Sequence, residues 1–168
     1  MTELEHFRAE KDNFFANHPQ SPLTQAQKQA FKGLNYFDEN PALRFEVKVS
    51  PFPVHDQVEI QTSTGDVRVY TRFARIKFPV DGQEAELTIY ETVDGFFLPF
   101  VDSLAGMETY PAGRYLDLEQ LPDDRFLVDF NLAYNPYCAY NDAWSCPLTP
   151  FENRLKVPIR AGEKLFHS

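Results

Sequence analysis

The sequence predicts a mainly β protein: an antiparallel barrel or sandwich with an N-terminal pair of helices packed on it. From residue 43 onward, short segments of alternating apolar and polar residues follow one another at hairpin spacing, with no helix-length segment between them. The chain of 168 residues is 43% hydrophobic and 15% aromatic, which suffices for a core without metal or disulfide. We therefore expect a single domain over residues 1–168, with a helical hairpin over 1–33 and a β-rich body over 43–165.

Two capping boxes begin the helices predicted near the N-terminus. Thr2 and Glu5 have the spacing at which each side chain caps the backbone of the other, and Thr24 and Gln27 repeat it. Apolar residues at helical intervals, interrupted by Lys11, indicate an amphipathic first helix. Its polar face is mixed and acidic, so we expect its phenylalanines to pack on one side of a sheet and not on a membrane surface. The predicted helices cover residues 2–17 and 24–31.

Period-two alternation and turn signals indicate the strands of the β-rich body. Apolar and charged side chains alternate from Leu43 to Val49, as in a strand with one buried face. The segment Ser63–Asp66 and the pair Asp81-Gly82 have the composition of hairpin turns. The predicted strands are residues 43–49, 58–61, 67–73, 73–80, 84–90, 96–100, 114–118, 126–130 and 154–159.

The chain is acidic, which argues against two classes of partner. With 25 acidic and 16 basic residues its formal net charge is −9, so it repels nucleic-acid phosphates and anionic lipid head groups. No apolar run approaches the roughly 20 residues of a membrane span. The first residues are acidic where a signal peptide is basic. We therefore expect a cytoplasmic protein that binds neither nucleic acid nor membranes, and a homo-oligomer is left open.

Familiar motifs of nucleotide, cofactor and metal chemistry are absent from the sequence. It has no phosphate-binding glycine-rich loop, no GxSxG elbow, no HExxH and no paired CxxC. The histidines are scattered without the i, i+4 pairing of a metal-binding helix. We expect no organic cofactor and no histidine-rich metal site.

Two segments carry a dense set of motifs. Residues 108–117 read ETYPAGRYLD, and residues 129–155 contain DFNLAYNPYCAYN and CPLTPFENRL. These stretches resemble the motifs of domain-of-unknown-function family 1684, found in bacteria and archaea, and the likeness runs from about Phe97 to Lys164. The sequence departs from the family pattern in loops, at Pro111-Ala112, Tyr137 and Thr149. No activity is established for this family, so the resemblance assigns no role to any residue.

Residues 129–153 form a loop between the last two predicted strands that is too long for a plain connection. The loop combines aromatic side chains with amides, carboxylates and thiols, a mixture suited to a ligand pocket. Alternatively, the aromatic residues plug a barrel end while Asn and Asp side chains cap turns. We favour the pocket, because the charged residues exceed what turns require. The candidate ligand-binding residues here and nearby are Tyr110, Tyr115, Asn131, Tyr134, Asn135, Cys138, Tyr140, Cys146 and Asn153.

The candidate catalytic residues are Glu108, Arg114, Asp129 and Glu152. Strand pairing is expected to place either Arg114 or Tyr115 opposite Asp129. We expect Arg114, Asp129 and Glu152 to line one cavity, where two carboxyl groups act as acid and base and Arg114 holds an anionic substrate group.

The leading functional hypothesis is therefore a small-molecule hydrolase or isomerase that uses Asp/Glu acid–base chemistry without an organic cofactor. Three alternatives stay open. The charged residues form a structural ion-pair network, the protein is a non-catalytic β-barrel that binds a ligand, or Glu108, Asp129 and Glu152 bind a divalent metal.

The two cysteines do not have the spacing of a zinc or redox motif. We expect Cys138 and Cys146 to be packed thiols in a reducing compartment, with a loop-closing disulfide as the second interpretation. A nucleophilic cysteine is the third, but the sequence identifies no base that would lower its pKa.

Overall fold

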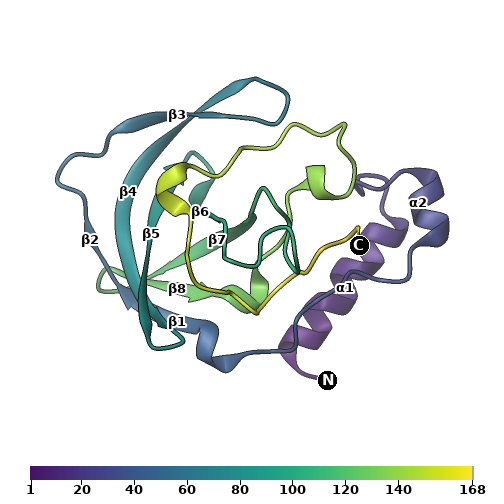
Figure 1. Ribbon diagram of the computed structural model, residues 1–168, viewed down its shortest axis with the longest axis horizontal. Coiled ribbons are helices and arrows are strands. Elements are labelled where there is room, and N and C mark those ends of the chain that lie inside the picture. The colour runs from purple at the N-terminus through teal and green to yellow at the C-terminus, as the bar shows by residue number, and fades with distance from the viewer. Residues whose placement is uncertain (168) are drawn as a thin grey trace.

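An antiparallel sheet curls into a nearly closed barrel in this computed structural model, which describes residues 1–167 (Figure 1). The strand order is β1-β8-β7-β6-β5-β4-β2, and β3 also pairs with β4. At the seam, the ring of Phe45 on β1 lies 5.4 Å from that of Phe78 on β4, between centroids. The strands are β1 (Arg44–Lys48), β2 (Ser50–Pro51), β3 (Gln57–Gln61), β4 (Val67–Val80), β5 (Gln83–Thr92), β6 (Gly95–Phe100), β7 (Arg114–Leu121) and β8 (Arg125–Asp129). The predicted fold class is confirmed.

The main core fills the inside of the curled sheet. Alternate residues of every long strand point inward, including Ile76, Leu87, Leu98 and Phe126, each at most 1% exposed. A bulge between Arg72 and Ala74 shifts the register of β4 against β5. The sequence expectation of two strands meeting at residue 73 corresponds to one long strand interrupted there.

The bulge changes which face of β4 its residues occupy. Tyr70, before the bulge, packs with Ile60 and Tyr90 in a second, smaller apolar cluster, whereas Ala74, after it, lies in the main core. Val58 and Phe97 pack against this second cluster. The β3–β4 hairpin thus supplies an apolar layer on the outer face of the sheet.

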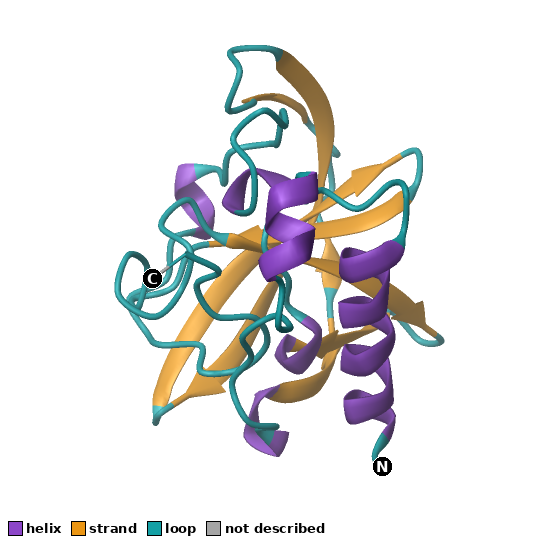
Figure 2. Cartoon of the chain, turned by 90° about the vertical axis from the view of Figure 1, so that its right-hand side faces the viewer, coloured by secondary structure: helices purple, strands orange, loops and turns teal. Residues whose placement is uncertain are grey.

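The helices α1 (Glu3–Asn17) and α2 (Gln25–Ala30) begin with the two predicted capping boxes, both complete. They pack mainly on the segments after β8, not on a strand face as expected: the ring of Phe15 lies 4.9 Å from that of Tyr140, and Phe166 joins the same cluster. In Figure 2 the helices lie in front of the strands with much of the loop structure. Neither helix in the described chain is long and apolar enough to cross a membrane.

The predicted strand over residues 154–159 is wrong. After β8 the chain forms short 3₁₀ helices and isolated bridges, one of them between Val101 and Arg154. The carbonyls of Ile159, Ala161 and Glu163 accept hydrogen bonds from the Arg114 guanidinium, so a side chain takes the place of a neighbouring strand. The 3₁₀ helices are η1 (Pro41–Leu43), η2 (Phe130–Leu132), η3 (Tyr137–Ala139) and η4 (Phe151–Asn153).

The predicted register of Asp129 is also wrong. Strand β7 continues to Leu121, which pairs with Arg125, so the hairpin turn is shorter than expected. Asp123 and Asp124 make this tight turn with φ of 65° and 57°, a left-handed conformation that Asp tolerates. Asp129 is consequently paired with Arg44 of β1, and neither Arg114 nor Tyr115 lies opposite it.

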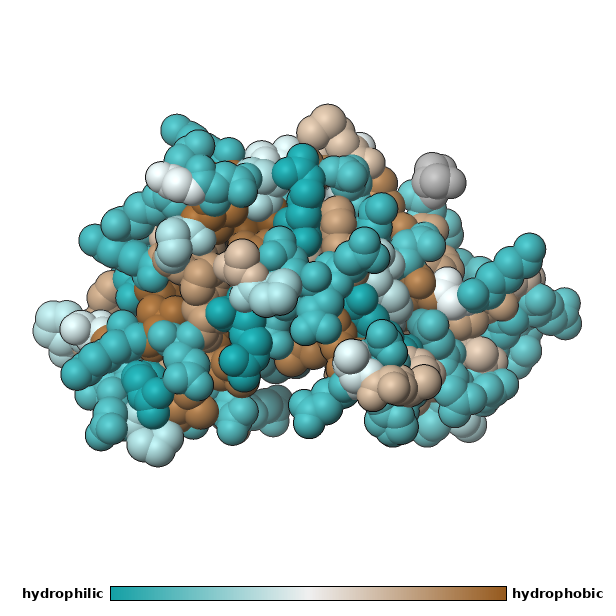
Figure 3. Space-filling model, turned by 90° about the horizontal axis from the view of Figure 1, so that it is seen from below, coloured by the Kyte–Doolittle hydropathy of each residue, from teal (hydrophilic) through white to brown (hydrophobic). Residues whose placement is uncertain are grey.

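The face of the molecule seen from below (Figure 3) agrees with the polar composition of the chain. Figure 3 shows one face of the molecule on which polar residues predominate and apolar residues emerge in scattered patches.

Candidate functional site

Arg114 is buried and bound entirely by the protein itself. Its guanidinium donates to the carbonyls of Ile159 at 2.8 Å, Ala161 at 2.5 Å and Glu163 at 3.0 Å. Asp102 supplies a carboxylate oxygen 3.8 Å away. Burial lowers the pKa of Arg114 to about 10, and the charges of Asp102 and Glu163 oppose that shift. This arginine fastens the C-terminal segment to β7.

Asp129 caps the 3₁₀ helix η2. Its Oδ1 accepts hydrogen bonds from the backbone N–H of Asn131 at 3.0 Å and from the Asn131 side chain at 2.9 Å. The buried Asn131 also exchanges hydrogen bonds with the backbone of Asn40. Arg44 lies 3.7 Å from the other carboxylate oxygen. Asp129 and Asn131 therefore join the end of β8 to the segment before β1.

Glu152 lies in an ion-pair network on the outer face of β4 and β5. Arg72 donates to both of its oxygens, at 2.8 and 3.1 Å, and the hydroxyls of Thr88 and Tyr90 donate at 3.0 and 2.5 Å. Burial raises the pKa of Glu152, but these hydrogen bonds outweigh burial and hold the pKa below its ordinary value. The adjacent Asn153 is fully buried and bonded to backbone groups of Thr88 and Pro99.

The structure does not bring the candidate catalytic residues together. Arg114, Asp129 and Glu152 each bind a different set of partners. Glu108 is a half-buried residue whose carboxylate lies 3.8 Å from the guanidinium of Arg160. Within residues 1–167 no group of three or more His, Cys, Asp or Glu side chains is arranged to hold a metal ion. The proposed metal site of Glu108, Asp129 and Glu152 is therefore not formed.

Asn135 and Tyr140 surround a buried carboxylate that sequence reasoning missed. Glu163 is 0% exposed, pairs with the ammonium of Lys11 at 2.5 Å and accepts hydrogen bonds from the Tyr140 hydroxyl and the Asn135 backbone. The signal available in the sequence was Lys11, which interrupts the apolar face of α1. A lysine at such a position needs a partner when the face is buried.

Cys138 and Cys146 are free and lie beside each other. The backbone N–H of Cys138 donates to the Cys146 sulfur at 3.3 Å. The hydroxyl of Ser63, in the β3–β4 turn, is 3.1 Å from the Cys138 sulfur and accepts from the Cys146 backbone at 3.1 Å. Burial, together with a hydrogen bond to the Cys138 thiol, raises the pKa of Cys146 to about 11. The pair fixes the loop on the hairpin.

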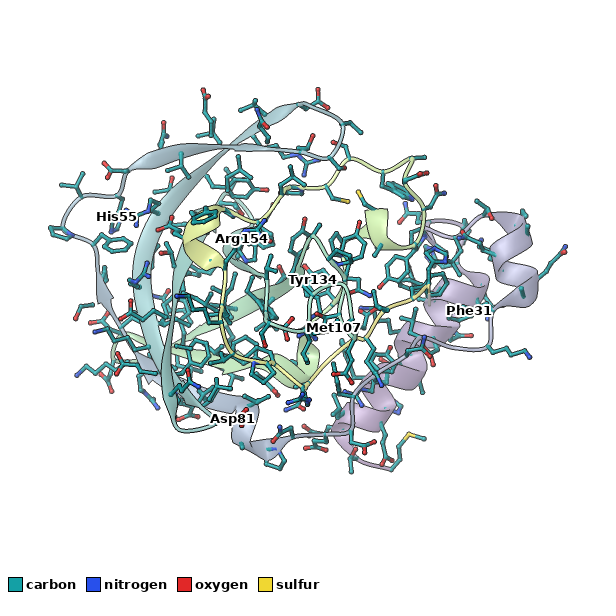
Figure 4. The ribbon with its side chains drawn as sticks, viewed as in Figure 1. Phe31, His55, Asp81, Met107, Tyr134 and Arg154 are labelled. Carbon is teal, nitrogen blue, oxygen red and sulfur yellow. The ribbon has the colours of Figure 1, made fainter. Side chains whose placement is uncertain are left out.

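A pocket of about 740 Å³ opens on the outer face of the sheet, between the β3–β4 hairpin, β6 and β7. We call it the aromatic pocket. Two candidate ligand-binding residues, Tyr115 and Tyr134, line it, and Tyr110, Cys138 and Tyr140 line a different pocket of about 470 Å³. Figure 4 places Tyr134 between the sheet and α1. Its lining includes Tyr70, Phe97, Tyr115, Asp117, Tyr134 and Arg68.

Strand alternation and register assemble the wall of the aromatic pocket. Tyr115 and Asp117 are two residues apart on β7 and share its outer face, and Asp117 is paired with Phe97 on β6. An isolated bridge pairs Tyr115 with Tyr134, so the Tyr134 ring comes from the loop that follows β8. Its hydroxyl donates to Asp117 at 2.9 Å.

The aromatic rings of this wall touch in sequence. The ring centroids of Tyr70 and Phe97 are 5.6 Å apart, those of Phe97 and Tyr115 4.8 Å, and those of Tyr115 and Tyr134 5.8 Å. The last two contacts are edge-to-face, at interplanar angles of 71° and 85°. The rings therefore present surfaces in nearly perpendicular directions.

A smaller neighbouring pocket, of about 460 Å³, shares Asp117 and Tyr134 with the aromatic pocket. Lys11 and Phe15 of α1 line it. The ammonium of Lys11 lies 5.1 Å from the centroid of the Tyr134 ring, so this side of Tyr134 already faces a cation of the protein itself.

Fold and site together define a class: a nearly closed antiparallel β-barrel with an N-terminal helical hairpin and an aromatic pocket on the outer face of the sheet. The chain belongs to the family described as "Protein of unknown function (DUF1684)", whose model matches residues 29–164, and the resemblance seen in the sequence is thereby confirmed. The chain is similar to an uncharacterized protein from gene locus rrnAC0354 of Haloarcula marismortui, known from a solution NMR structure. The two are 38% identical, with a TM-score of 0.73, covering 96% of this chain and 92% of that one. No curated protein matches.

Proposed function

We propose that the protein binds a small organic molecule in the aromatic pocket, as a binding module without catalytic action. The observation that carries the proposal is the contiguous wall of Tyr70, Phe97, Tyr115 and Tyr134 beside the carboxylate of Asp117. Ligand sites in proteins are typically concave and apolar, with a few polar groups that fix orientation. The volume of about 740 Å³ suits a molecule of metabolite size.

The acid–base hydrolase or isomerase has less support. A general acid or base must reach a reacting group with a free proton or lone pair. Asp129 caps a helix, and Glu152 is bound by several donors. Arg114 is only 1% exposed, so it offers no donor to an anionic substrate. These contacts favour structural roles for the three residues.

The proposal is tested by NMR titration of the ¹⁵N-labelled protein with benzyl alcohol, a neutral aromatic probe. We expect saturable shifts of backbone amides around Phe97, Tyr115 and Tyr134. The variant Tyr134→Ala should weaken binding about tenfold, since it removes one aromatic wall. Tyr137→Ala is the matched control, because Tyr137 is a half-buried tyrosine of the same loop that lines the neighbouring pocket and not the aromatic pocket.

Two outcomes would contradict the proposal. One is shifts dispersed over the surface with no saturation, and the other is equal weakening by both substitutions. Thermal unfolding of each variant shows whether it is folded under the conditions of the titration, and Tyr134→Phe, which keeps the ring, should bind as the wild type does.

A further inference from the structure

The polar group of the aromatic pocket is an anion beside aromatic faces. Asp117 is exposed, is paired with Phe97 across β6 and β7, and accepts one hydrogen bond from Tyr134 at 2.9 Å. Phe97, Tyr115 and Tyr134 line the same pocket as Asp117, and their rings are in edge-to-face contact with one another. We call these four residues the cage. The face of an aromatic ring is the negative part of its quadrupole, so rings and carboxylate attract the same kind of charge.

Among the residues that line the pocket, the one basic side chain is that of Arg68, and it binds groups outside the cage. Arg68 donates to the carbonyl of Ser145 at 3.0 Å. It also lies near the hydroxyl of Tyr70: burial raises the pKa of that hydroxyl, and the arginine opposes the rise. A second carboxylate, Asp94, lines the pocket as well. Two acidic residues and one basic residue line this pocket, so its formal charge is negative.

Tyr134 already interacts with an ammonium group of the protein. The Lys11 ammonium lies 5.1 Å from the Tyr134 centroid, and its charge is balanced by Glu163 at 2.5 Å. Lys11 lines the neighbouring pocket and does not line the aromatic pocket. The cage repeats this pairing of an aromatic ring with a carboxylate, with Asp117 in the position that Glu163 has beside Lys11. No lysine lines the aromatic pocket.

Both hydroxyl groups of the cage donate to groups of the protein itself. The hydroxyl of Tyr134 donates to Asp117, and the hydroxyl of Tyr115 donates to the carbonyl of Pro147. A primary ammonium carries three N–H donors that each need an acceptor when desolvated, whereas an alkylated ammonium needs few or none. Aromatic rings with one carboxylate therefore suit a methylated or otherwise alkylated ammonium.

We infer that the ligand of the aromatic pocket carries an alkylated ammonium group, held by the cage of Phe97, Tyr115, Tyr134 and Asp117. The inference rests on the proposed function and adds the chemical class of the ligand. The rings contact the alkyl groups around the nitrogen, and Asp117 supplies the countercharge.

The test compares choline with dimethylbutanol, the uncharged molecule in which carbon replaces the choline nitrogen. Both are titrated into the ¹⁵N-labelled wild type and into Asp117→Asn, which keeps the size of the side chain and removes its charge. Glu119→Gln is the matched control, because Glu119 is an exposed acid of the same strand outside the pocket. We expect choline to bind the wild type about tenfold more tightly than dimethylbutanol. Asp117→Asn should abolish most of this difference, and Glu119→Gln should preserve it.

The outcomes separate the two proposals. If both probes shift the amides of the aromatic pocket with equal affinity, the pocket binds ligands but the inference of a cationic ligand is wrong. If neither choline, dimethylbutanol nor benzyl alcohol shifts those amides, the proposed function is wrong as well. Equal loss of choline binding in Asp117→Asn and Glu119→Gln would show that only the net charge attracts choline, and would overturn the cage.

Discussion

The role of an individual charged residue in this protein depends mainly on how many of its hydrogen-bonding groups are already bound by other groups of the protein. Arg114, Asp129 and Glu152 belong to the two motif segments, and their charges suggested one reactive cavity. Each instead bonds to backbone or side-chain groups of a different element. The sequence identifies which residues carry charge, but their partners are set by the tertiary fold. Asp102 and Ile159, for example, are far from Arg114 in the chain and meet it only in the folded protein.

Glu152 leads to a prediction about pH. Its pKa lies below 4.5 in the folded protein, the ordinary value of a glutamate, so its ionised form stabilises the fold. We expect Glu152→Gln to lower the free energy of unfolding by about 1–2 kcal/mol at neutral pH, because the hydrogen bonds from Arg72 lose their charged acceptor. The contribution is present above the unfolded-state pKa and is lost as the pH falls through the folded-state pKa.

Urea unfolding at a series of pH values measures this difference. The curves of the wild type and Glu152→Gln should begin to converge as the pH falls below 4.5, and should meet below the folded-state pKa, where Glu152 is protonated in the folded and the unfolded protein. The exposed Glu119→Gln serves as control and should follow the wild type throughout. A difference that stays constant down to acidic pH would show that the charge of Glu152 does not contribute to stability.

At the scale of secondary-structure elements, the most accurate predictions came from signals between residues that are close together in the chain. Both capping boxes and the hairpin turn at Asp81-Gly82 formed as expected, because these depend on residues adjacent in the chain. The strand over residues 154–159 did not form, since alternation alone does not provide a neighbouring strand. The aromatic pocket was anticipated only through Tyr115 and Tyr134. Phe97 and Asp117, which complete the cage, became identifiable once the pairing of β6 with β7 was known.

Contacts of the two cysteines with Ser63 join the loop after β8 to the β3–β4 hairpin, and this leads to the second prediction. A thiol titration of the protein denatured without reductant should detect two free thiols, those of Cys138 and Cys146. In the folded protein Cys146 should react slowly with iodoacetamide, because it is 8% exposed and its pKa of about 11 leaves little thiolate at neutral pH. Cys138→Ala separates the two rates, since only Cys146 then reacts.

The absence of thiols after denaturation would mean a disulfide. Rapid stoichiometric alkylation of one cysteine in the folded protein would instead indicate a reactive nucleophile. Replacement of either cysteine by alanine should leave benzyl alcohol binding in the aromatic pocket within about twofold, because neither side chain lines it.

For the whole molecule, contacts connect the first helix to the interior of the barrel. Lys11 and Phe15 of α1 bind Glu163 and Tyr140. The segment that carries Glu163 is bonded to Arg114, which lies on β7 and is 1% exposed. The helical hairpin therefore has no core of its own: the apolar cluster that buries its phenylalanines is completed by residues from the loop after β8 and from the C-terminal segment.

We therefore predict that the helical hairpin and the barrel unfold together. Far-ultraviolet circular dichroism reports on backbone structure throughout the chain, and the amide signals of Leu87 and Leu98 in the ¹⁵N-labelled protein report on the barrel core, so the two urea transitions should coincide. Lys11→Met leaves the buried Glu163 without its cation and should shift both transitions to lower urea by the same amount, with a loss of about 3 kcal/mol. Because the connection between α1 and the barrel passes through the C-terminal segment, an early loss of helix in Lys11→Met with an unchanged transition of the barrel-core amides would instead divide the chain into two folding units.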